Sequence, residues 1–300
     1  MNSPRVTVVT VYYNRESLVE RTLDSLLAQT YSDFEIIAID DQSKDDTYLR
    51  LKSFTDSRLQ VRIQKNKGFT LTMRDTLAEV RSEYIAIQGS GDESRPQRLE
   101  RQVAFLDDHP EVGAVGCHVN HINELSGRTH LHIRSKPFDI LKTNIFTQGE
   151  VMMRRSVYEA VGGYRAFFKF AQDADLWCRM NRISELDVIP EVLYDRYIIP
   201  DSVSGNPLRR FEQLQYLNAI QQFELIYRKY GFDPVERFGE KAWMWVTARP
   251  QNVVMCQGLA RRFADQLGKD VAAAMADLAW RQRKMLRTLF TKLKMGGFKE

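Results

Sequence analysis

Two pairs of aspartates stand where a folded chain could use them for chemistry. Asp40 and Asp41 end the apolar run FEIIAI, and Asp173 and Asp175 stand in the segment QDADLW. A carboxylate beside a bound ligand can accept hydrogen bonds or take a proton from an attacking hydroxyl group. Neighbours on extended backbone point to opposite sides, so we expect Asp41 to face a ligand and Asp40 to organise the following turn. The alternative is that this pair only caps the next helix.

The second pair lies on a predicted helix that covers residues 173 to 182. Side chains two positions apart on a helix are separated by about 200°, so Asp173 and Asp175 cannot both face one hydroxyl group. We therefore expect one to act and the other to support it. The alternative is that Asp173 caps the helix that carries Leu176 and Met180, and one carboxylate can do both.

Short apolar runs alternate with amphipathic segments in the part of the chain that must position the first pair. They predict strands over 6–11, 34–39, 59–64 and 83–88, and helices over 17–29, 46–54 and 70–81, the first one capped by Ser17 with Glu20. Such alternation within about ninety residues is typical of a doubly wound sheet, whose ligands lie beyond the carboxyl ends of the strands. We expect an α/β fold with a Rossmann-like, mostly parallel sheet and flanking helices.

The rest of the chain is less regular. We predict a helix that starts at Pro96 with Ser94 as its cap, a strand over 112–119 and a short helix over 156–161. Residues 120–150 are polar and weakly periodic, so we expect loops with one short strand. From Leu208 onward the patterns are helical. We therefore expect two domains, an α/β domain over 1–205 and a helical extension over 206–300.

Composition narrows the class of protein. The 300 residues include 43% hydrophobic and 27% charged types, and the net charge of +4 is too small to indicate nucleic acid as a partner. Cys117, Cys178 and Cys256 are far apart and form no CxxC pair, which argues against a zinc site or a disulfide framework. The N-terminus lacks the pattern of a signal peptide, and no run approaches the roughly 18 apolar residues that span a bilayer. We expect a protein of the reducing cytoplasm.

Four segments in order resemble family 2 glycosyltransferases, whose fold is of the GT-A type. They are VTVVTVYYNRESLVERTLDSLLAQTYSDFEIIAIDDQSKDDT, NKGFTLTMRD, YIAIQGSGDESRPQRLERQVAFLDDHPEVGAVG and VMMRRSVYEAVGGYRAFFKFAQDADLWCRM. The resemblance implies inverting transfer of a sugar from a nucleotide-diphosphate donor, most simply of UDP type, to an acceptor hydroxyl in cell-surface polysaccharide or glycolipid assembly. QDADLW is similar to the family's Glu-Asp-x-Asp-x-Trp, with Gln172 in place of the glutamate. It assigns Asp173 as the base, because a hydroxyl group must lose its proton as it attacks.

The resemblance also implies the residues that bind each substrate. For the nucleotide they are Val11, Tyr13, Asp41, Arg74, Gly91 and Asp92, where Tyr13 offers an aromatic face and Asp41 accepts from the base or ribose. Arg74 has the alternative of a solvated helix residue. For the acceptor side, or as support, they are Asp175, Arg98 and Met152. Arg98 has the alternative of a structural residue, and Met152 that of core packing. Four histidines, His118, His121, His130 and His132, are expected at the surface or in an acceptor loop.

One loop departs from the family. Gly89-Ser90-Gly91-Asp92 replaces an Asp-x-Asp-Asp loop that holds a divalent cation, and Ile199-Pro200 replaces a His-Pro pair. Asp92 alone remains as a ligand for Mg²⁺ or Mn²⁺, which take several oxygens. Three interpretations stay open. The enzyme binds metal weakly through Asp92 and donor phosphates; it needs no metal, with glycine N–H groups and Arg74, Arg95 or Arg98 balancing the charge; or the chain is an inactive nucleotide-sugar-binding or partner-binding protein.

The last twenty residues carry a basic, amphipathic pattern. Between Trp280 and Glu300 there are seven basic residues and one acid, and Met285, Leu286, Leu289, Phe290 and Leu293 share a helical stripe. This predicts contact with a membrane surface at its inner face, which would suit a lipid-linked acceptor, or with a partner helix. The alternative is a terminal helix packed on its own domain.

Overall fold

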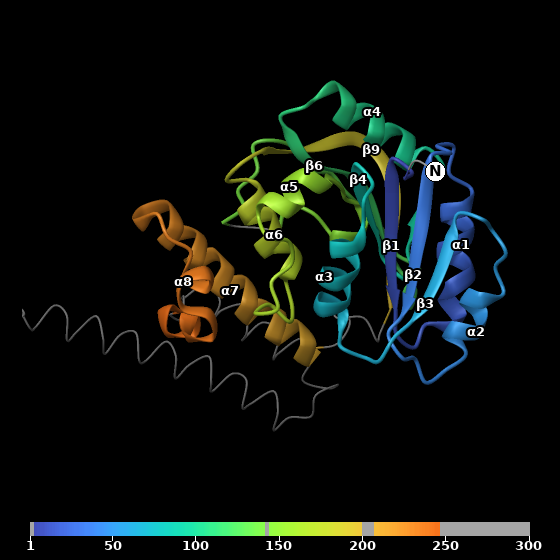
Figure 1. Ribbon diagram of the computed structural model, residues 1–300, viewed down its shortest axis with the longest axis horizontal. Coiled ribbons are helices and arrows are strands. Elements are labelled where there is room, and N and C mark those ends of the chain that lie inside the picture. The colour runs from blue at the N-terminus through green and yellow to red at the C-terminus, as the bar shows by residue number, and fades with distance from the viewer. Residues whose placement is uncertain (1–2, 142–143, 200–206, 247–300) are drawn as a thin grey trace, which may run out of the picture. The chain divides into compact units, whose positions relative to one another are not determined.

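The computed structural model describes residues 3–141, 144–199 and 207–246 (Figure 1). The chain divides into two compact units, Met1–Ile199 and Pro200–Glu300. The basic helix expected over 280–300 lies outside the described residues, as does Cys256, so both expectations stay predictions.

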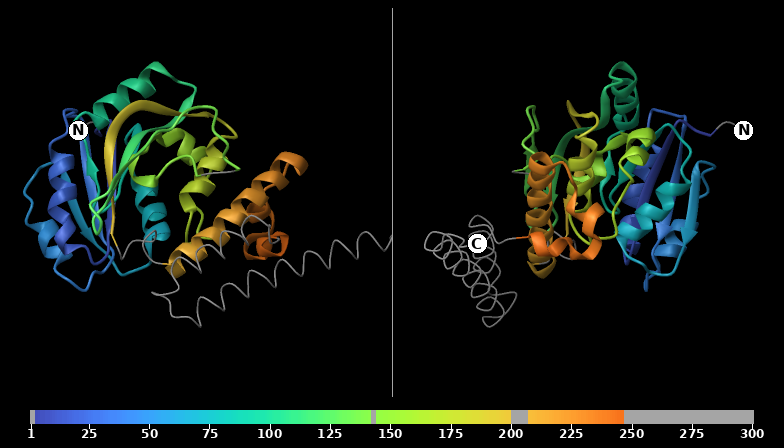
Figure 2. Two further views of the ribbon diagram at one scale, coloured as in Figure 1. Left: turned by 180° about the vertical axis from the view of Figure 1, so that it is seen from behind. Right: turned by 60° about the vertical axis from the view of Figure 1, so that its left-hand side comes forward.

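Four parallel strands form the first half of a nine-stranded sheet. They are β1 (Val6–Tyr12), β2 (Phe34–Asp40), β3 (Leu59–Ile63) and β4 (Tyr84–Gln88), in the spatial order β3-β2-β1-β4. The helices between them are α1 (Val19–Leu27), α2 (Thr47–Lys52) and α3 (Phe69–Glu79). Right-handed crossovers put α1 and α2 on one face and α3 on the other (Figures 1 and 2). This confirms the predicted doubly wound arrangement.

Burial explains why these strands appear in the sequence as continuous apolar runs. Every residue of β1 is buried, and so is every residue of β4, because helices cover both faces of a parallel sheet. Val8, Ile36 and Ala86 from three strands join Leu23 of α1 in one hydrophobic core. The loops at the carboxyl ends of these strands are therefore attached to a closely packed core.

The second half of the sheet is mixed, so the expectation of a mostly parallel sheet holds only for the first half. β8 (Met152–Arg154) runs antiparallel to β4 and to β6 (Val112–Asn123), and β6 runs parallel to β9 (Glu185–Ile198). β5 (Glu93–Ser94) and β7 (Thr129–His132) complete it, on β9 and β6 respectively. The helices of this half are α4 (Arg98–Asp108), α5 (Arg155–Ala160), α6 (Gln172–Met180) and the short 3-10 helix η2 (Gln148–Glu150).

Both predicted serine caps are wrong. A 3-10 turn, η1 (Glu16–Leu18), precedes α1, and neither element has a side-chain cap at its own N-cap residue. The loop after β2 and the start of α2 supply the acceptors instead: the Glu16 N–H donates to Asp45 Oδ2 over 3.2 Å, and the Arg15 N–H donates to Thr47 Oγ1 over 2.8 Å. Ser94 belongs to β5 and donates to Gln88 Oε1 over 2.6 Å, so it does not cap α4. At the start of α1, acceptors that are distant in sequence thus take the place of the predicted local cap.

The second unit is helical where it is described. It contains α7 (Pro207–Tyr230), α8 (Pro234–Phe238) and the 3-10 helix η3 (Gly239–Trp245). Asp233 caps α8 by accepting from the Val235 and Glu236 N–H groups, and the rings of Phe232, Phe238 and Trp245 pack together. Among the described helices, none combines the length and the apolar character that crossing a membrane requires.

Candidate active site

The strand order creates a switch point between β1 and β4. The chain leaves β1 through α1 toward β2, whereas β4 lies on the other side of β1, so the connections diverge and leave room beyond the strand ends. Two residues just past neighbouring strands, Asn14 after β1 and Gln42 after β2, have positive φ angles of 52° and 61°. Such backbone is uncommon outside glycine and gathers at functional loops, which makes this edge the first place to look for a site.

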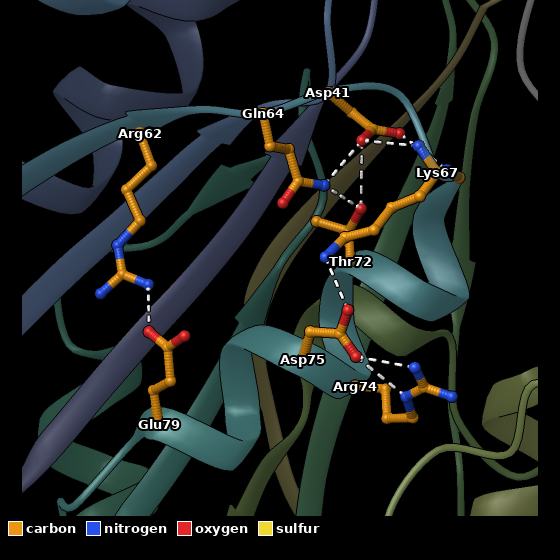
Figure 3. A network of polar contacts seen from close by, with 9 residues as sticks. Asp41, Arg62, Gln64, Lys67, Thr72, Arg74, Asp75 and Glu79 are labelled. Carbon is orange, nitrogen blue, oxygen red and sulfur yellow. Dashed lines mark hydrogen bonds and ion pairs between the residues drawn. The ribbon is translucent and has the colours of Figure 1, made fainter.

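Asp41 organises the loop between β3 and α3. Its Oδ1 accepts from Gln64 Nε2 over 2.7 Å and from Thr72 Oγ1 over 3.2 Å, while Oδ2 accepts from the Gly68 N–H over 2.9 Å (Figure 3). Asp40 turns the other way and accepts from the Ser43 N–H, as the alternation of the strand predicted. Asp41 is therefore a buried carboxylate at the strand edge that already has several donors of its own.

The other nucleotide candidates near this edge differ in exposure. Tyr13 follows β1 and leaves 42% of its surface open, so its ring can meet a ligand. Val11 is nearly buried and pairs with Ile39 of β2. Arg74 lies on α3 with an exposed guanidinium that donates to Asp75 Oδ1 over 2.9 Å, and Lys67 contacts the other oxygen of Asp75 (Figure 3). Tyr13 and Arg74 remain accessible; Val11 contributes packing.

The glycine loop after β4 does not offer the N–H groups that we expected for an anion. The Gly89 N–H donates to the Tyr194 hydroxyl over 3.0 Å, and the Gly91 N–H donates to Thr22 Oγ1 over 2.8 Å. The loop also continues into β5 rather than into a helix. Both glycine donors are therefore already used, and this part of the expectation is wrong.

Asp92 is bound on both oxygens by β9. Tyr194 donates its hydroxyl to Oδ2 over 2.9 Å, and the Tyr197 N–H donates to Oδ1 over 2.9 Å. Burial raises the pKa of the Asp92 carboxyl, while Arg196 and these two donors oppose the rise. Within the described ranges no cluster of three His, Cys, Asp or Glu residues could hold a metal ion. One carboxylate with both oxygens engaged does not fit a protein-held divalent cation.

Close packing explains why this loop needs glycine. A Cβ at Gly89 would lie 2.3 Å from Asp92 Oδ2, and a Cβ at Gly149 would lie 2.1 Å from the Tyr194 hydroxyl oxygen. Gly91 has a φ of +109° and faces Leu18. Gly89 therefore lacks the space for a side chain, and Gly91 has a backbone conformation that favours glycine. These are the two loop positions at which the family carries acids.

Two residues expected to act on a substrate are structural instead. Arg98 has no exposed surface; its guanidinium donates to Gln88, Ser94, Gln102 and the carbonyls of Ile87 and Gly149. Met152 is fully buried in β8 between β4 and β6. Neither can touch an acceptor or a diphosphate, so Met152 follows its alternative of core packing.

Of the three candidate arginines, Arg95 pairs with Asp195, and Arg74 alone lies at the edge with Asp41.

Asp173 lies in the first turn of α6. Ala171, just before the helix, has a φ of +56° and makes no side-chain cap. The Asp173 side chain is buried, and its Oδ2 accepts from Asn144 Nδ2 over 2.7 Å. Burial raises the pKa of Asp173, and the Asn144 amide opposes the rise. A carboxylate that is harder to ionise is a better proton acceptor once ionised, which suits a general base.

Asp175 faces away from Asp173, as its position on the helix predicted. It forms ion pairs with Arg165 and with Arg179, the latter over 2.7 Å. Arg179 in turn donates to the carbonyls of Val161 and Gly163. Asp175 therefore connects α6 with Arg165 and, through Arg179, with the turn that follows α5.

Two contacts connect α6 with both loops of the sheet edge. Gln172 donates to Gln148 Oε1 over 3.0 Å, and η2, which carries Gln148, also packs Gly149 against Tyr194 next to Asp92. Thr70 of α3 donates to the Phe168 carbonyl over 3.0 Å, which ties the Asp41 loop to the segment before α6. Asp41, Asp92 and Asp173 thus belong to one connected region. No sequence pattern indicates Asn144, Tyr194 or Gln148, because their partners are distant along the chain.

Comparison with known proteins supplies the context for this geometry. A family model described as glycosyl transferase family 2 matches residues 7–173. The putative glycosyltransferase EpsE of Bacillus subtilis is 34% identical over 188 residues, which cover 60% of this chain and 68% of the relative. The O-antigen biosynthesis glycosyltransferase WbnJ of Escherichia coli is 27% identical over 234 residues, 73% of this chain and 88% of the relative.

Solved structures share the fold. Residues 1-349 of S. aureus TarS in complex with UDP match with a TM-score of 0.59 and 17% identity, over 99% of this chain and 93% of that chain. The mannosyltransferase PcManGT from Pyrobaculum calidifontis, in complex with GDP-Man and Mn²⁺, matches with a TM-score of 0.60 and 20% identity, over 97% and 88%.

Proposed function

The chain belongs to glycosyltransferase family 2, and we propose that it moves a sugar with inversion from a nucleotide-diphosphate donor to an acceptor hydroxyl, with Asp173 as base. The acceptor oxygen attacks the anomeric carbon from the face opposite the diphosphate. Its proton passes to Asp173, and the bond from the anomeric carbon to the diphosphate breaks with the electron pair on the leaving oxygen.

The observation that carries this proposal is the environment of Asp173. Burial raises the pKa of this carboxyl, and the amide of Asn144 holds one of its oxygens over 2.7 Å. An oriented carboxylate with raised basicity is what proton removal from a sugar hydroxyl needs. The N-cap residue of α6 is Ala171, and the backbone N–H groups of Asp173 and Ala174 also act on the Asp173 carboxylate, so the capping role weighed as an alternative operates beside the proposed catalytic one.

For the donor we propose a UDP-type nucleotide at the edge that contains Tyr13, Asp41 and Arg74. The exposed Tyr13 ring suits stacking on a base, Asp41 offers carboxylate oxygens, and the guanidinium of Arg74 suits a phosphate. TarS, a neighbour in fold, was solved in complex with UDP, whereas PcManGT was solved in complex with GDP-Man. The nucleotide is therefore the first property to measure.

We also propose that transfer needs no protein-held metal ion. Both Asp92 oxygens accept hydrogen bonds from β9, and Gly89 and Gly91 supply no carboxylate. Weak Mg²⁺ or Mn²⁺ binding through donor phosphates is the competing proposal, supported by the Mn²⁺ in the PcManGT complex. Activity that persists in EDTA would separate the two.

For the acceptor we propose a glycan or a lipid-linked glycan of a cell-surface polysaccharide. The support is the similarity to WbnJ, a glycosyltransferase of O-antigen biosynthesis. We propose a cytoplasmic protein that meets the inner membrane surface through residues 280–300, since the seven basic residues there suit anionic lipid.

The test begins with the donor. Thermal shifts with UDP-, GDP-, dTDP- and CMP-sugars, each with Mn²⁺ and with EDTA, should identify one nucleotide that stabilises the protein in both conditions. Transfer from that donor is then compared in Asp173→Asn and in Asp108→Asn, an exposed matched control on α4. We expect Asp173→Asn to lower kcat by about 100-fold to 10,000-fold while donor binding persists. Unchanged kcat would remove Asp173 as the base, and donor binding without transfer by the natural chain would favour the binding protein.

A further inference from the structure

A buried ion pair joins the chain after β7 to the 3-10 helix η2. Arg134, two residues after β7, contacts the carboxylate of Glu150, the last residue of η2. The side chains of Arg134 and Glu150 are 4% and 0% exposed. Taking two charges out of water is expensive, and apolar residues of similar size often stabilise a protein equally well. What the pair holds in place is therefore a better explanation for it than stability alone.

Glu150 also holds the chain just before η2. Its Oε1 accepts from the Thr147 N–H over 2.8 Å, and its Oε2 accepts from the Thr147 hydroxyl, which together form a capping box. η2 itself is attached to α4, because Gln102 Nε2 donates to the Glu150 carbonyl over 2.7 Å. Glu150 is thus a fixed point to which Arg134 and Thr147 are both bound. We call Arg134, Thr147 and Glu150 the clamp.

The segment that the clamp holds, residues 144–148, contacts α6 through three alternate residues. Asn144 donates to Asp173 Oδ2 over 2.7 Å, the rings of Phe146 and Trp177 meet edge to face with centroids 5.5 Å apart, and Gln148 Oε1 accepts from Gln172 over 3.0 Å. The guanidinium of Arg134 lies over the ring of Phe146, 5.8 Å from its centroid. Thr147 turns to Glu150 instead. The segment is thus bound by α6 and by the clamp at once.

We propose that the clamp positions Asn144 against Asp173. Asn144 Nδ2 donates to the Asp173 carboxylate, whereas Asn144 Oδ1 is buried and has no hydrogen-bond partner among the described residues. The side chain of Asn144 therefore has no second bond of its own to fix the amide. Its orientation must come from the backbone of the segment, which the clamp holds. That Asp173 is the base rests on the proposed function, whereas the positioning of Asn144 does not.

The clamp also acts on Asp173 by charge, and this effect can be separated from positioning. Burial raises the pKa of Asp173, the charge of Glu150 adds to the rise, and the Asn144 amide opposes it. The buried Tyr164, which precedes α6, also interacts with Asp173. Loss of the Glu150 charge alone should lower the pKa of Asp173, and loss of the Asn144 bond should raise it. The two effects therefore have opposite signs.

Thr147→Val tests positioning without changing a charge. It removes the hydroxyl that donates to Glu150 and keeps the shape of the side chain. The pKa of Asp173 is followed by ¹³C NMR of the aspartate carboxyl groups, with the signal assigned by Asp173→Asn. We expect this pKa to rise toward its value in Asn144→Ala. Thr30→Val, which removes an exposed hydroxyl bond to Glu100, is the matched control. A titration curve identical to that of the natural chain would overturn the proposal.

The ion pair is tested by the double substitution Arg134→Met/Glu150→Leu, made in the natural chain and in Asn144→Ala. Apolar replacement of both partners leaves no charge unpaired, so we expect a folded protein, which thermal unfolding checks. In Asn144→Ala only the Glu150 charge is lost, and the pKa of Asp173 should fall. In the natural chain the released amide opposes that fall. Equal shifts in the two backgrounds would overturn the proposal. Arg62→Met/Glu79→Leu removes an exposed pair and should shift neither curve.

Transfer kinetics show whether the positioning serves the reaction. Thr147→Val should lower kcat by roughly tenfold while the donor KM stays, because a displaced base loses alignment with the acceptor hydroxyl. Arg134→Lys keeps a cation for Glu150 and should retain more activity than Arg134→Met. Unchanged kcat in Thr147→Val and in the double variant would overturn the role in transfer. If the natural chain transfers no sugar, the proposed function fails, and the NMR titrations still decide whether the clamp positions Asn144.

Discussion

The Tyr194 hydroxyl donates to Asp92 Oδ2 over 2.9 Å and accepts from the Gly89 N–H over 3.0 Å. Tyr194 is fully buried, and Gly149 packs directly against its hydroxyl. The buried Tyr194 side chain therefore holds Asp92, the one acid that remains in the loop. Its hydroxyl also lies beside Gly89, a position where the family carries another acid. The glycine at position 89, where the family motif has an acid, and the buried hydroxyl of Tyr194 therefore depend on each other.

Tyr194→Phe should destabilise the protein although it changes a single oxygen atom. The substitution leaves the Gly89 N–H and a buried Asp92 oxygen without their partner. We expect the free energy of unfolding to fall by about 1–3 kcal/mol. Urea denaturation measures it, with Tyr230→Phe as control because Tyr230 is 60% exposed. Equal midpoints for Tyr194→Phe and the natural chain would contradict this account of the loop.

Gly89→Ala should disturb the same arrangement from the other side. A Cβ there would meet Asp92 Oδ2 at 2.3 Å and force the carboxylate away from Tyr194. We expect a loss of about 1–3 kcal/mol in unfolding free energy, the usual cost of inserting atoms into a packed site. In a double-mutant cycle with Tyr194→Phe the two losses should be less than additive, because both remove one contact. Strict additivity would mean that the two residues act independently.

The parallel half of the fold could be predicted from sequence because each strand there is a short apolar run followed by an amphipathic helix. The mixed half could not. β5 and β8 have two and three residues, too few for any periodicity, and Pro190 interrupts the pattern of the 14-residue β9. These strands form because neighbours distant in sequence pair with them, and single-chain patterns do not carry that information.

The predictions for the site residues also divide into those that local geometry allowed and those that it did not. The contrasting directions of Asp40 and Asp41, and of Asp173 and Asp175, follow from strand and helix geometry and were predicted correctly. The burial of Arg98 and Met152 was only an alternative to a substrate contact, since residue type alone does not decide between a surface and a core position. Asn144 and Tyr194 matter only through contacts that the folded sheet creates. Local geometry is readable from sequence, and long-range partners are not.

Asn144→Ala should move the acidic limb of the activity profile. Burial raises the pKa of Asp173, and the bond from Asn144 favours its charged form and so opposes the rise. Removing the amide should raise this pKa further. Because the base must be ionised, kcat/KM will then begin to fall at a higher pH as the solution is acidified. Asn120→Ala, which removes a bond to Asp195 instead, should leave the profile in place. A limb that stays put in Asn144→Ala would show that the amide does not act on the base.

Arg74→Ala and Arg62→Ala form a matched pair that tests the donor edge. Both arginines are partly exposed, and each pairs with one acid, Arg74 with Asp75 over 2.9 Å and Arg62 with Glu79 over 2.8 Å. Exposed pairs contribute little, so we expect both variants to unfold within about 0.5 kcal/mol of the natural chain. Arg74 lies on α3 beside the loop that Asp41 holds, whereas Arg62 lies on β3 (Figure 3). If Arg74 contacts a donor phosphate, its loss should raise the donor KM by roughly tenfold or more, while Arg62→Ala keeps the natural KM. Equal KM values in the two variants would return Arg74 to the role of a solvated helix residue and leave the donor charge to other groups.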